Sequence, residues 1–302
     1  MNRTYVIGAR GSRLSLRQVE LLSEALRASM PGVELRLREI HTEGDRATAP
    51  LSQIGGLGVF TKAIEDALLA REVDIAVHSL KDLPTALSPG LVLGAIMRRE
   101  DARDALVSRG GLALVQLPVG ARIGTGSGRR AAQLAAMRPD VEPVEIRGNV
   151  DTRIKKAESG EYDATVLAMA GLTRLGLLAS VAQVFSVEEM LPAVGQAALG
   201  IEVRSDDADA LALVGGIDHA DTRAAVEAER AYLSRLGGGC QQPVGAYATV
   251  EGGELRLRVM IAGGGRIFRA EARGAASEAA AVGLVAADDV LAQGAARFVE
   301  MP

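Results

Sequence analysis

Short apolar runs alternate with longer segments of helical periodicity along most of this chain, and this alternation limits the possible folds more than any other feature. The run Tyr5–Ala9 has the length of a buried strand. In residues 14–30, which follow it, Val19, Leu22 and Leu26 recur at helical spacing, and a Pro-Gly pair then stops the helix. Alternation of this kind is typical of a parallel α/β sheet covered by helices. We therefore predict an α/β fold.

The alternation stops and restarts, which indicates more than one lobe. A charged stretch, Arg98–Asp104, separates the first set of predicted strands from a second set, which the chain leaves near Pro192–Gly195. The apolar run Leu199–Val203 is then typical of a strand that returns to the first lobe. Beyond Asp221 a helix precedes an alternating hairpin and an Ala-rich helical tail, as in a small α+β domain. We predict domain 1 at residues 1–98 and 196–217, domain 2 at residues 99–195, and domain 3 at residues 218–302.

Composition excludes several classes of protein. Lys and Arg total 34 against 38 Asp and Glu, and the net charge of −4 does not suit a nucleic-acid coat. No apolar run approaches the roughly 18 residues of a membrane span. The histidines, His41, His78 and His219, lack metal-ligand spacing, and a single cysteine cannot form an internal disulfide. We expect a cytoplasmic monomer that binds no metal.

A glycine-rich string, Gly124-Thr-Gly-Ser-Gly128, follows a predicted strand and is followed directly by Arg129 and Arg130. Glycines let backbone N–H groups approach an anion, and the next helix offers its positive end. The string matches neither a P-loop, whose lysine it lacks, nor the dinucleotide fingerprint, so on its own it can equally be a tight strand-to-helix turn. Two cations at a helix N-terminus oppose the macrodipole, however, and this favours a multiply charged anion at that place.

Further arginines recur just past the ends of predicted strands. Only four of the 34 basic residues are lysines, a bias that genomic composition can largely explain, so their placement matters more than their number. Ligands of open α/β sheets bind at this edge, and guanidinium groups pair well with planar carboxylates. Each arginine alone could be a solvated surface residue, but together they favour a polyanionic ligand in a cleft. They are Arg147, Arg153 and Arg174 in the second lobe, and Arg10 and Arg13 in the first.

The segment from His78 to Pro84, HSLKDLP, also follows a predicted buried strand and holds Asp82 beside Lys81. A carboxylate beside a lysine can stay ionised in a cleft, where it can stabilise a developing cation or move a proton. The simpler alternative is a helix cap with a surface ion pair.

The single cysteine, Cys240, lies in a glycine-rich string that runs from Leu236 to Gly245. A lone cysteine is usually a small buried apolar residue, but a glycine-rich loop makes a packing role less natural. A thiol in open surroundings suits covalent attachment or nucleophilic work.

Taken together, these strings resemble the hydroxymethylbilane synthases, also called porphobilinogen deaminases. The resemblance runs from Gly8 to Tyr247, and the motifs HSLKDLP, RRAAQL, RGNVDTR, AGLTRLGL and GGGCQQPVGAYA occur in family order and at family spacing. It implies two lobes like those of type II periplasmic binding proteins and a small third domain that bears the cysteine.

The resemblance also implies a reaction. Members of the family condense four porphobilinogen molecules head to tail, with release of ammonia, to give linear hydroxymethylbilane for haem biosynthesis. They use a dipyrromethane cofactor joined by a thioether to a cysteine, which here would be Cys240. Asp82 would be the catalytic carboxylate, which contacts pyrrole nitrogens and stabilises the cationic azafulvene formed when ammonia leaves. The other implied site residues are Ser12, Lys81, Thr125, Ser127, Arg129 and Arg130 for the cofactor, and Arg10, Arg13, Arg147, Arg153 and Arg174 for substrate carboxylates.

Two segments depart from the family pattern. Residues 45–58 are polar, Gly-rich and without periodicity, and we predict a long mobile loop there, of the kind that often serves as a lid. Leu57 stands in it where many relatives carry lysine, which puts in doubt a contact to substrate carboxylates at that position. Gly126 and Gly128 replace the bulkier residues common in their loop.

Two other functions compete with this hypothesis. A two-lobed protein could bind a polycarboxylate without chemistry, although the cysteine loop would then have no purpose. A nucleotide-dependent enzyme could use the glycine-rich string, although that string lacks the nucleotide-binding fingerprints.

Overall fold

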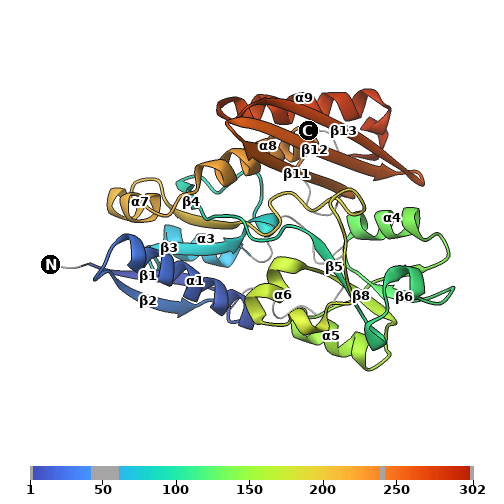
Figure 1. The fold of residues 1–302 in the computed structure, drawn as a ribbon. Coiled ribbons are helices and arrows are strands. Elements are labelled where there is room, and N and C mark those ends of the chain that lie inside the picture. Colours follow the sequence, from blue (N-terminus) through green and yellow to red (C-terminus); the bar gives the residue numbers. More distant parts are fainter. Residues whose placement is uncertain (1–2, 42–60, 239–241, 300–302) are drawn as a thin grey trace. The chain divides into compact units, whose positions relative to one another are not determined.

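The computed structural model describes residues 3–41, 61–238 and 242–299 (Figure 1). The chain forms two compact units, Met1–Arg99 with Ala198–Ala224, and Glu100–Ala197 with Ala225–Pro302. The division into three domains stays a prediction. The predicted lid loop at residues 45–58 and the predicted cofactor residue Cys240 lie outside the described residues.

The first unit is a five-stranded sheet with helices, and its strand order is β2-β1-β3-β10-β4. Strand β1 pairs in parallel with β2 and β3, whereas β10 pairs antiparallel with β3 and β4. Its elements are β1 (Thr4–Ala9), α1 (Arg13–Ser29), β2 (Glu34–Glu39), α3 (Lys62–Leu69), β3 (Ile75–Ser79), the 3-10 turn η1 (Leu80–Asp82), β4 (Leu91–Ile96), β10 (Leu199–Arg204) and α7 (Ala208–Gly215).

The return of the chain through β10 makes this sheet mixed. The predicted return strand Leu199–Val203 is confirmed, because it pairs with β3 and β4 of the first unit. The prediction of a parallel sheet was wrong for this strand. Parallel pairing requires a crossover connection, usually a helix, that brings the chain back to the same end of the sheet. Strand β10 instead follows residues 100–197 of the second unit. It runs through the sheet in the direction opposite to β3 and β4.

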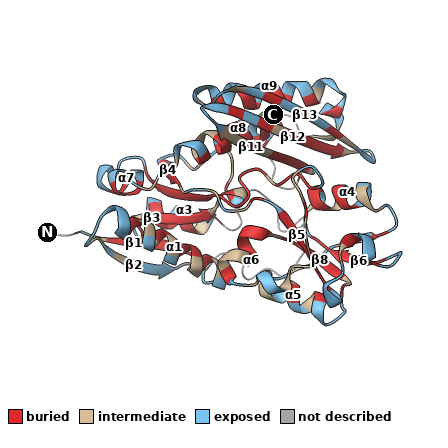
Figure 2. Ribbon diagram, in the orientation of Figure 1, coloured by how far each residue is buried: buried red, intermediate tan, exposed pale blue. Residues whose placement is uncertain are grey.

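The edge strand β2 is mostly exposed (Figure 2). Apolar and polar residues alternate in it, a pattern typical of a half-buried strand, but Leu37 is 45% exposed and Leu35 is the residue of β2 that packs against the core. The difference arises because helix α1 lies against β1 and β3 and leaves the edge strand uncovered.

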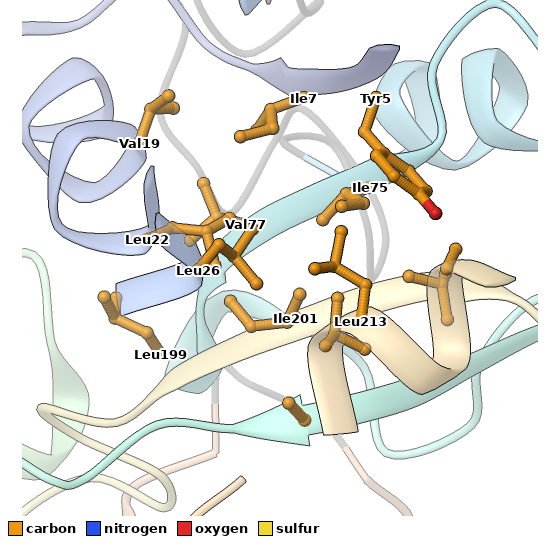
Figure 3. Packing of buried hydrophobic residues seen from close by; sticks show 14 of the residues in the cluster. Tyr5, Ile7, Val19, Leu22, Leu26, Ile75, Val77, Leu199, Ile201 and Leu213 are labelled. Carbon is orange, nitrogen blue, oxygen red and sulfur yellow. The ribbon is translucent and has the colours of Figure 1, made fainter. Parts of the chain in front are cut away.

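The main core of the first unit lies between α1 and the sheet (Figure 3). Leu22 and Leu26 of α1 meet Ile7, Ile75 and Ile201 of three strands, and these five side chains are almost completely inaccessible to water. Each contributes roughly 1.5–3 kcal/mol through burial of apolar surface. The helical periodicity seen in the sequence therefore marks the face that holds α1 to the sheet.

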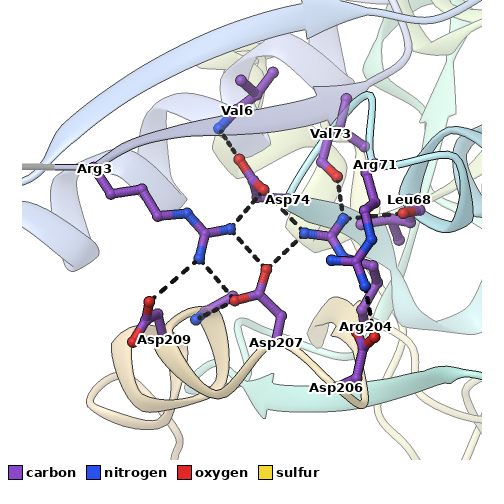
Figure 4. Close-up of polar contacts among 11 residues, drawn as sticks. Arg3, Val6, Leu68, Arg71, Val73, Asp74, Arg204, Asp206, Asp207 and Asp209 are labelled. Atoms are coloured by element: carbon purple, nitrogen blue, oxygen red, sulfur yellow. Dashed lines mark hydrogen bonds and ion pairs between the residues drawn. The ribbon is translucent and has the colours of Figure 1, made fainter.

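At one end of the sheet, four charged residues join elements that are far apart in the sequence (Figure 4). Arg3 donates to the carboxylates of Asp74 and Asp207, and the buried Arg204 donates to the same two carboxylates. Arg204 also donates to two backbone carbonyls near the end of α3, and Asp207 caps the N-terminus of α7. The network therefore ties β1, β10 and α7 to the start of β3.

We expect Asp207→Ala to lower the free energy of unfolding by about 3 kcal/mol at pH 7, because it leaves Arg204 buried beside one carboxylate fewer and removes a helix cap. The hydrogen bond from Arg3 is the main reason that the pKa of Asp207 lies well below its usual range. Its stabilising effect is therefore complete above the ordinary pKa of an aspartate, about 4, and is lost as the pH falls further.

Urea unfolding at pH 7 and at pH 3 measures this effect, and the difference between wild type and variant should shrink at the lower pH. Asp209→Ala is the matched control, because the Asp209 side chain is 77% exposed and only approaches Arg3, at 3.6 Å. We expect it to change stability by less than about 0.5 kcal/mol. Equal stability of the two variants at pH 7 would contradict the role given to Asp207.

The second unit contains another five-stranded sheet, with strand order β7-β6-β8-β5-β9. Strand β6 is parallel to β7 and β8, and β5 is antiparallel to β8. The elements of this part are β5 (Asp104–Ser108), η2 (Arg109–Gly111), η3 (Leu114–Gln116), β6 (Arg122–Gly124), α4 (Gly128–Met137), β7 (Glu142–Val144), α5 (Val150–Glu158), β8 (Ala164–Ala168), α6 (Met169–Leu175), η4 (Leu178–Ser180) and β9 (Gln183–Val184).

The C-terminal part of the chain is an antiparallel sheet of β11, β12 and β13 with helix α9 against β12 and β13. The predicted hairpin of alternating residues is confirmed as β12 and β13. The elements are α8 (Ala220–Arg235), β11 (Val244–Glu251), β12 (Glu254–Gly263), β13 (Arg266–Ala275), η5 (Ala276–Glu278), α9 (Ala279–Ala292) and η6 (Ala295–Phe298). Over the three ranges that the structure describes, no helix combines the length and the apolar character that crossing a membrane demands.

Candidate active site

A pocket of about 90 Å³ lies at the carboxyl end of β3 in the first unit. Asp82, the predicted catalytic residue, lines it together with Arg10 and Ser12, which are predicted to bind the ligands. The apolar part of its wall comes from Leu14 and Ile64, among others. A pocket with an apolar wall, a carboxylate and a guanidinium suits a small aromatic ring that carries charged groups.

Local structure explains how these side chains reach the pocket. Strand β3 ends at Ser79, and the 3-10 turn that follows immediately carries Asp82 to the edge of the sheet. Ser12 is the N-cap of α1 and accepts a hydrogen bond from the Ser15 backbone N–H, so the chain turns sharply after β1. Arg10 occupies that turn. The carboxyl ends of two parallel strands thus supply the two charged groups, as the sequence predicted.

Helix α1 contributes further polar residues to this pocket that were not predicted from the sequence. Gln18 donates from Nε2 to Ser79 Oγ at 2.8 Å, and both residues line the wall beside Ser15. Ser15 and Gln18 share the buried face of α1 with Val19 and Leu22. Two polar residues on an otherwise apolar helical face were a signal that could have revealed them.

In the second unit, the glycine-rich string forms the turn from β6 into α4. Thr125 is buried, and its hydroxyl accepts a hydrogen bond from the Ser127 backbone N–H. Ser127 is the N-cap of α4 and accepts from the backbone N–H of Arg130. The turn therefore brings two hydroxyl groups to the N-terminus of a helix, where an anion is stabilised by the helix dipole.

The adjacent arginines Arg129 and Arg130 are buried against a carboxylate of the protein itself. Asp104, which is completely inaccessible to water, lies 2.8 Å from Arg129 Nη1 and 2.7 Å from Arg130 Nη2. Burial lowers the pKa of Arg129, and the charge of Asp104 opposes that shift. The sequence indicated an anion beside these two cations, and Asp104 supplies one negative charge there. The role of both arginines in holding cofactor carboxylates stays a prediction.

The other predicted arginines of the second unit have separate surroundings. Arg147 donates to Glu145 and Arg153 donates to the Gly148 carbonyl, both at the start of α5. Arg174 is more deeply placed, donates to the Ala197 carbonyl at 2.6 Å, and has its pKa lowered to about 10 by burial.

The structure thus brings together some of the predicted site residues and leaves others apart. Arg10, Ser12 and Asp82 share one pocket, whereas Lys81 lies beside Asp82 in the turn and Arg13 begins α1 without lining that pocket. Within the described ranges, no three His, Cys, Asp or Glu side chains gather as a metal site would require.

Known proteins of one family match almost the entire chain. Residues 5–212 match the family model described as "Porphobilinogen deaminase, dipyromethane cofactor binding domain", and residues 223–292 match the one described as "Porphobilinogen deaminase, C-terminal domain". The chain belongs to the porphobilinogen deaminase family. The porphobilinogen deaminase of Roseiflexus sp. (strain RS-1) is 48% identical over 97% of this chain and 98% of that protein. That of Desulforudis audaxviator (strain MP104C) is 50% identical over 99% and 98%.

Solved structures resemble the chain at low sequence identity. The methionine-binding protein MetQ has a TM-score of 0.46 and 13% identity, and covers 71% of this chain and 89% of its own. A periplasmic arginine-binding protein of Salmonella typhimurium has a TM-score of 0.40 and 12% identity, with 71% and 91% covered. Membership of the porphobilinogen deaminase family, and not these resemblances, decides against the alternative of a binding protein without catalysis.

We expect Asp104→Asn to destabilise the second unit by about 3–5 kcal/mol, because two buried guanidinium groups would lose their carboxylate. Thermal unfolding of the variant should show a clear fall in Tm. Asp101→Asn is the matched control: it removes a partly exposed carboxylate that pairs with Arg103, and we expect its Tm to stay close to that of wild type. An unchanged Tm for Asp104→Asn would mean that the buried charges do not hold this part of the fold.

Proposed function

We propose that the chain performs the porphobilinogen deaminase reaction with the residues described above. It is a transferase, a hydroxymethylbilane synthase, that condenses four porphobilinogen molecules head to tail and releases ammonia. The observation that carries this conclusion is the match to both domains of one family over 5–212 and 223–292, with about half of all positions identical to curated members.

The arginines fit the charge of the substrate. Porphobilinogen carries two carboxylates, so the growing chain needs many cations, and a guanidinium binds a carboxylate through two parallel hydrogen bonds. Arg147 has a buried Nη2 without a hydrogen-bond partner among the described residues, and Arg129 has a buried Nε in the same condition. Such donors favour an acceptor supplied by a ligand, because an unsatisfied buried donor costs about 1–3 kcal/mol.

The described residues also fit a dipyrromethane. Arg10 and Ser12 offer donors for its acidic side chains, Asp82 offers an acceptor for its pyrrole N–H groups, and the apolar wall of the pocket suits a pyrrole ring. When bound, the cofactor supplies a covalently held chain end to which monomers are added, which removes the entropy cost of holding that end in place. We propose Cys240 as its point of attachment, through a thioether.

Asp82 is the proposed catalytic residue. Loss of ammonia from the aminomethyl group of the substrate leaves a cation that is conjugated with the pyrrole ring. A fixed carboxylate beside that cation lowers the barrier by a few kcal/mol, because the stabilising charge is already in place before the reaction. Asp82 is suited to this role because the turn η1 holds it in the wall of the pocket.

We further propose that the enzyme works in the cytoplasm as a monomer. A thioether forms from a free thiol, and a reducing compartment keeps the single cysteine in that form.

An intact-mass spectrum of the denatured protein tests the proposed attachment. We expect wild type to carry an adduct with the mass of a dipyrromethane, and Cys240→Ser to have the bare polypeptide mass, because a hydroxyl is a poorer nucleophile than a thiol. Wild type that stays bare after incubation with porphobilinogen would contradict the proposal. An adduct that persists in Cys240→Ser would assign it to another residue.

We expect Asp82→Asn to keep the fold and the covalent adduct but to reduce kcat by a factor of about 100–1,000, because the amide has no charge to stabilise the cation. Ammonia release and the colour reaction of the bilane measure the rate. Asp66→Asn, which changes an exposed aspartate of α3, is the control and should retain full activity. Turnover by Asp82→Asn within threefold of wild type would refute the role of this residue.

A further inference from the structure

A buried histidine–glutamate pair lies beside the pocket that holds Asp82, and its histidine lines that pocket. His78 is the fourth residue of β3, and its Nε2 lies 3.0 Å from Oε2 of Glu202 in the adjacent strand β10. The side chain of His78 is 4% exposed and that of Glu202 is completely buried. Both residues belong to the first unit, and the proposed function has so far used neither of them.

Glu202 has an unusual environment for a carboxylate. Its second oxygen, Oε1, is buried without a hydrogen-bond partner among the described residues, so His78 provides the hydrogen bond that the structure shows for this group. A buried carboxylate with so few donors strongly favours a hydrogen on the atom that faces it. The hydrogen of the neutral imidazole therefore belongs on Nε2, since a carboxylate orients an imidazole by accepting its N–H.

The other ring nitrogen is then a free acceptor. With the hydrogen on Nε2, Nδ1 carries a lone pair, and no hydrogen bond to Nδ1 is found among the residues that the structure describes. His78 lines the same pocket as Asp82 and Arg10. The carboxylate, the imidazole and the pocket thus follow one another in the order found in enzymes where a buried carboxylate orients a histidine that acts as a base.

The condensation requires a base as well as a group that stabilises a cation. Each addition forms a carbon–carbon bond between the methylene carbon of one pyrrole unit and the α-carbon of another. The C–H bond at that α-carbon then breaks, and its electron pair returns to the ring to restore aromaticity. The proton must go to an acceptor in the pocket. A separate acceptor leaves the Asp82 carboxylate charged throughout, ready to stabilise the cation that forms when the next ammonia leaves.

We propose that His78 Nδ1 accepts this proton and that the buried carboxylate of Glu202 holds the imidazolium that results. His78 would then be a second catalytic residue, and Glu202 a positioning residue that acts through it. The proton passes to water before the next addition and balances the ammonia that is released. The inference rests on the proposed function, because it assigns a step of that reaction.

The variant His78→Gln separates this role from a structural one. The glutamine amide N–H can occupy the place of Nε2 and keep the hydrogen bond to Glu202, but it leaves no basic atom at the place of Nδ1. We expect it to retain its Tm, its covalent adduct and a KM within about threefold of wild type, and to lose kcat by about 100-fold. With porphobilinogen deuterated at the free α-carbon, the isotope effect on kcat should be larger than in wild type, because removal of that hydrogen becomes slower.

Two further variants complete the test. His219→Gln changes a histidine that contacts Thr222 and lies outside the pocket, so it should behave as wild type in every measurement. Glu202→Gln keeps the shape of the pair but removes its charge, and we expect a smaller loss of kcat, about tenfold, together with a raised isotope effect.

The result that overturns the proposal is a His78→Gln enzyme with kcat within threefold of wild type, or one that is slow with an unchanged isotope effect. If His78→Gln does not fold, Glu202→Gln decides in the same way: a raised isotope effect supports the proposal and an unchanged one refutes it. Failure of the underlying function is distinguishable, because wild type itself would then form no bilane.

Discussion

Asp104 is buried without access to water, and the second unit depends on the way that this one charge is compensated. Three side chains converge on it: Arg129 and Arg130 at the start of α4, and Gln196, whose Nε2 donates at 2.9 Å. An isolated carboxylate in such a place would cost several kcal/mol, so these partners must be held in position. Arg130 also donates to a carbonyl of β8 and Arg129 to the carbonyl of Leu191. The charge of Asp104 thereby holds the start of α4 against β5, β8 and the segment around Leu191.

A second buried carboxylate joins this arrangement to the C-terminal part of the chain. Glu229 of α8 accepts hydrogen bonds from the backbone N–H groups of Gly195 and Ala248. Residues 195–197 are thus held by two buried carboxylates, because Gln196 contacts Asp104 and Gly195 contacts Glu229. Ala197 has a φ of +74°, a left-handed conformation that glycine adopts freely and alanine does not, and Arg174 donates to its carbonyl. Backbone strain persists where the surroundings over-determine the conformation, and these contacts supply that constraint.

The sequence allowed the α/β class and the return strand to be predicted, because each depends on local patterns of apolar residues. It could not reveal that Arg129 and Arg130 face Asp104. Asp104 begins β5 and is the last residue of the charged stretch 98–104, and only tertiary structure brings it to α4. The direction of β10 was equally hidden, since periodicity does not distinguish parallel from antiparallel pairing.

The pocket likewise combines residues that the sequence predicts with residues that it does not. Asp82 and Arg10 were predicted because they follow buried strands. Gln18 and Glu202 were missed, since a polar residue inside an apolar pattern indicates a buried polar contact but does not identify its partner. Their partners, Ser79 and His78, lie in another element of the fold.

The position of β10 has a consequence for the order in which this protein can be made. Strands β3 and β4 both belong to the first hundred residues, yet they do not pair with each other, because β10 lies between them and comes from residues 199–204. During synthesis, the N-terminal sheet must therefore wait, with the facing edges of β3 and β4 unpaired, until the ribosome has also released residues 100–197. The intervening segment carries its own sheet and its own core. Domains generally fold as units during synthesis, so this inserted part can be complete before the part that was translated first.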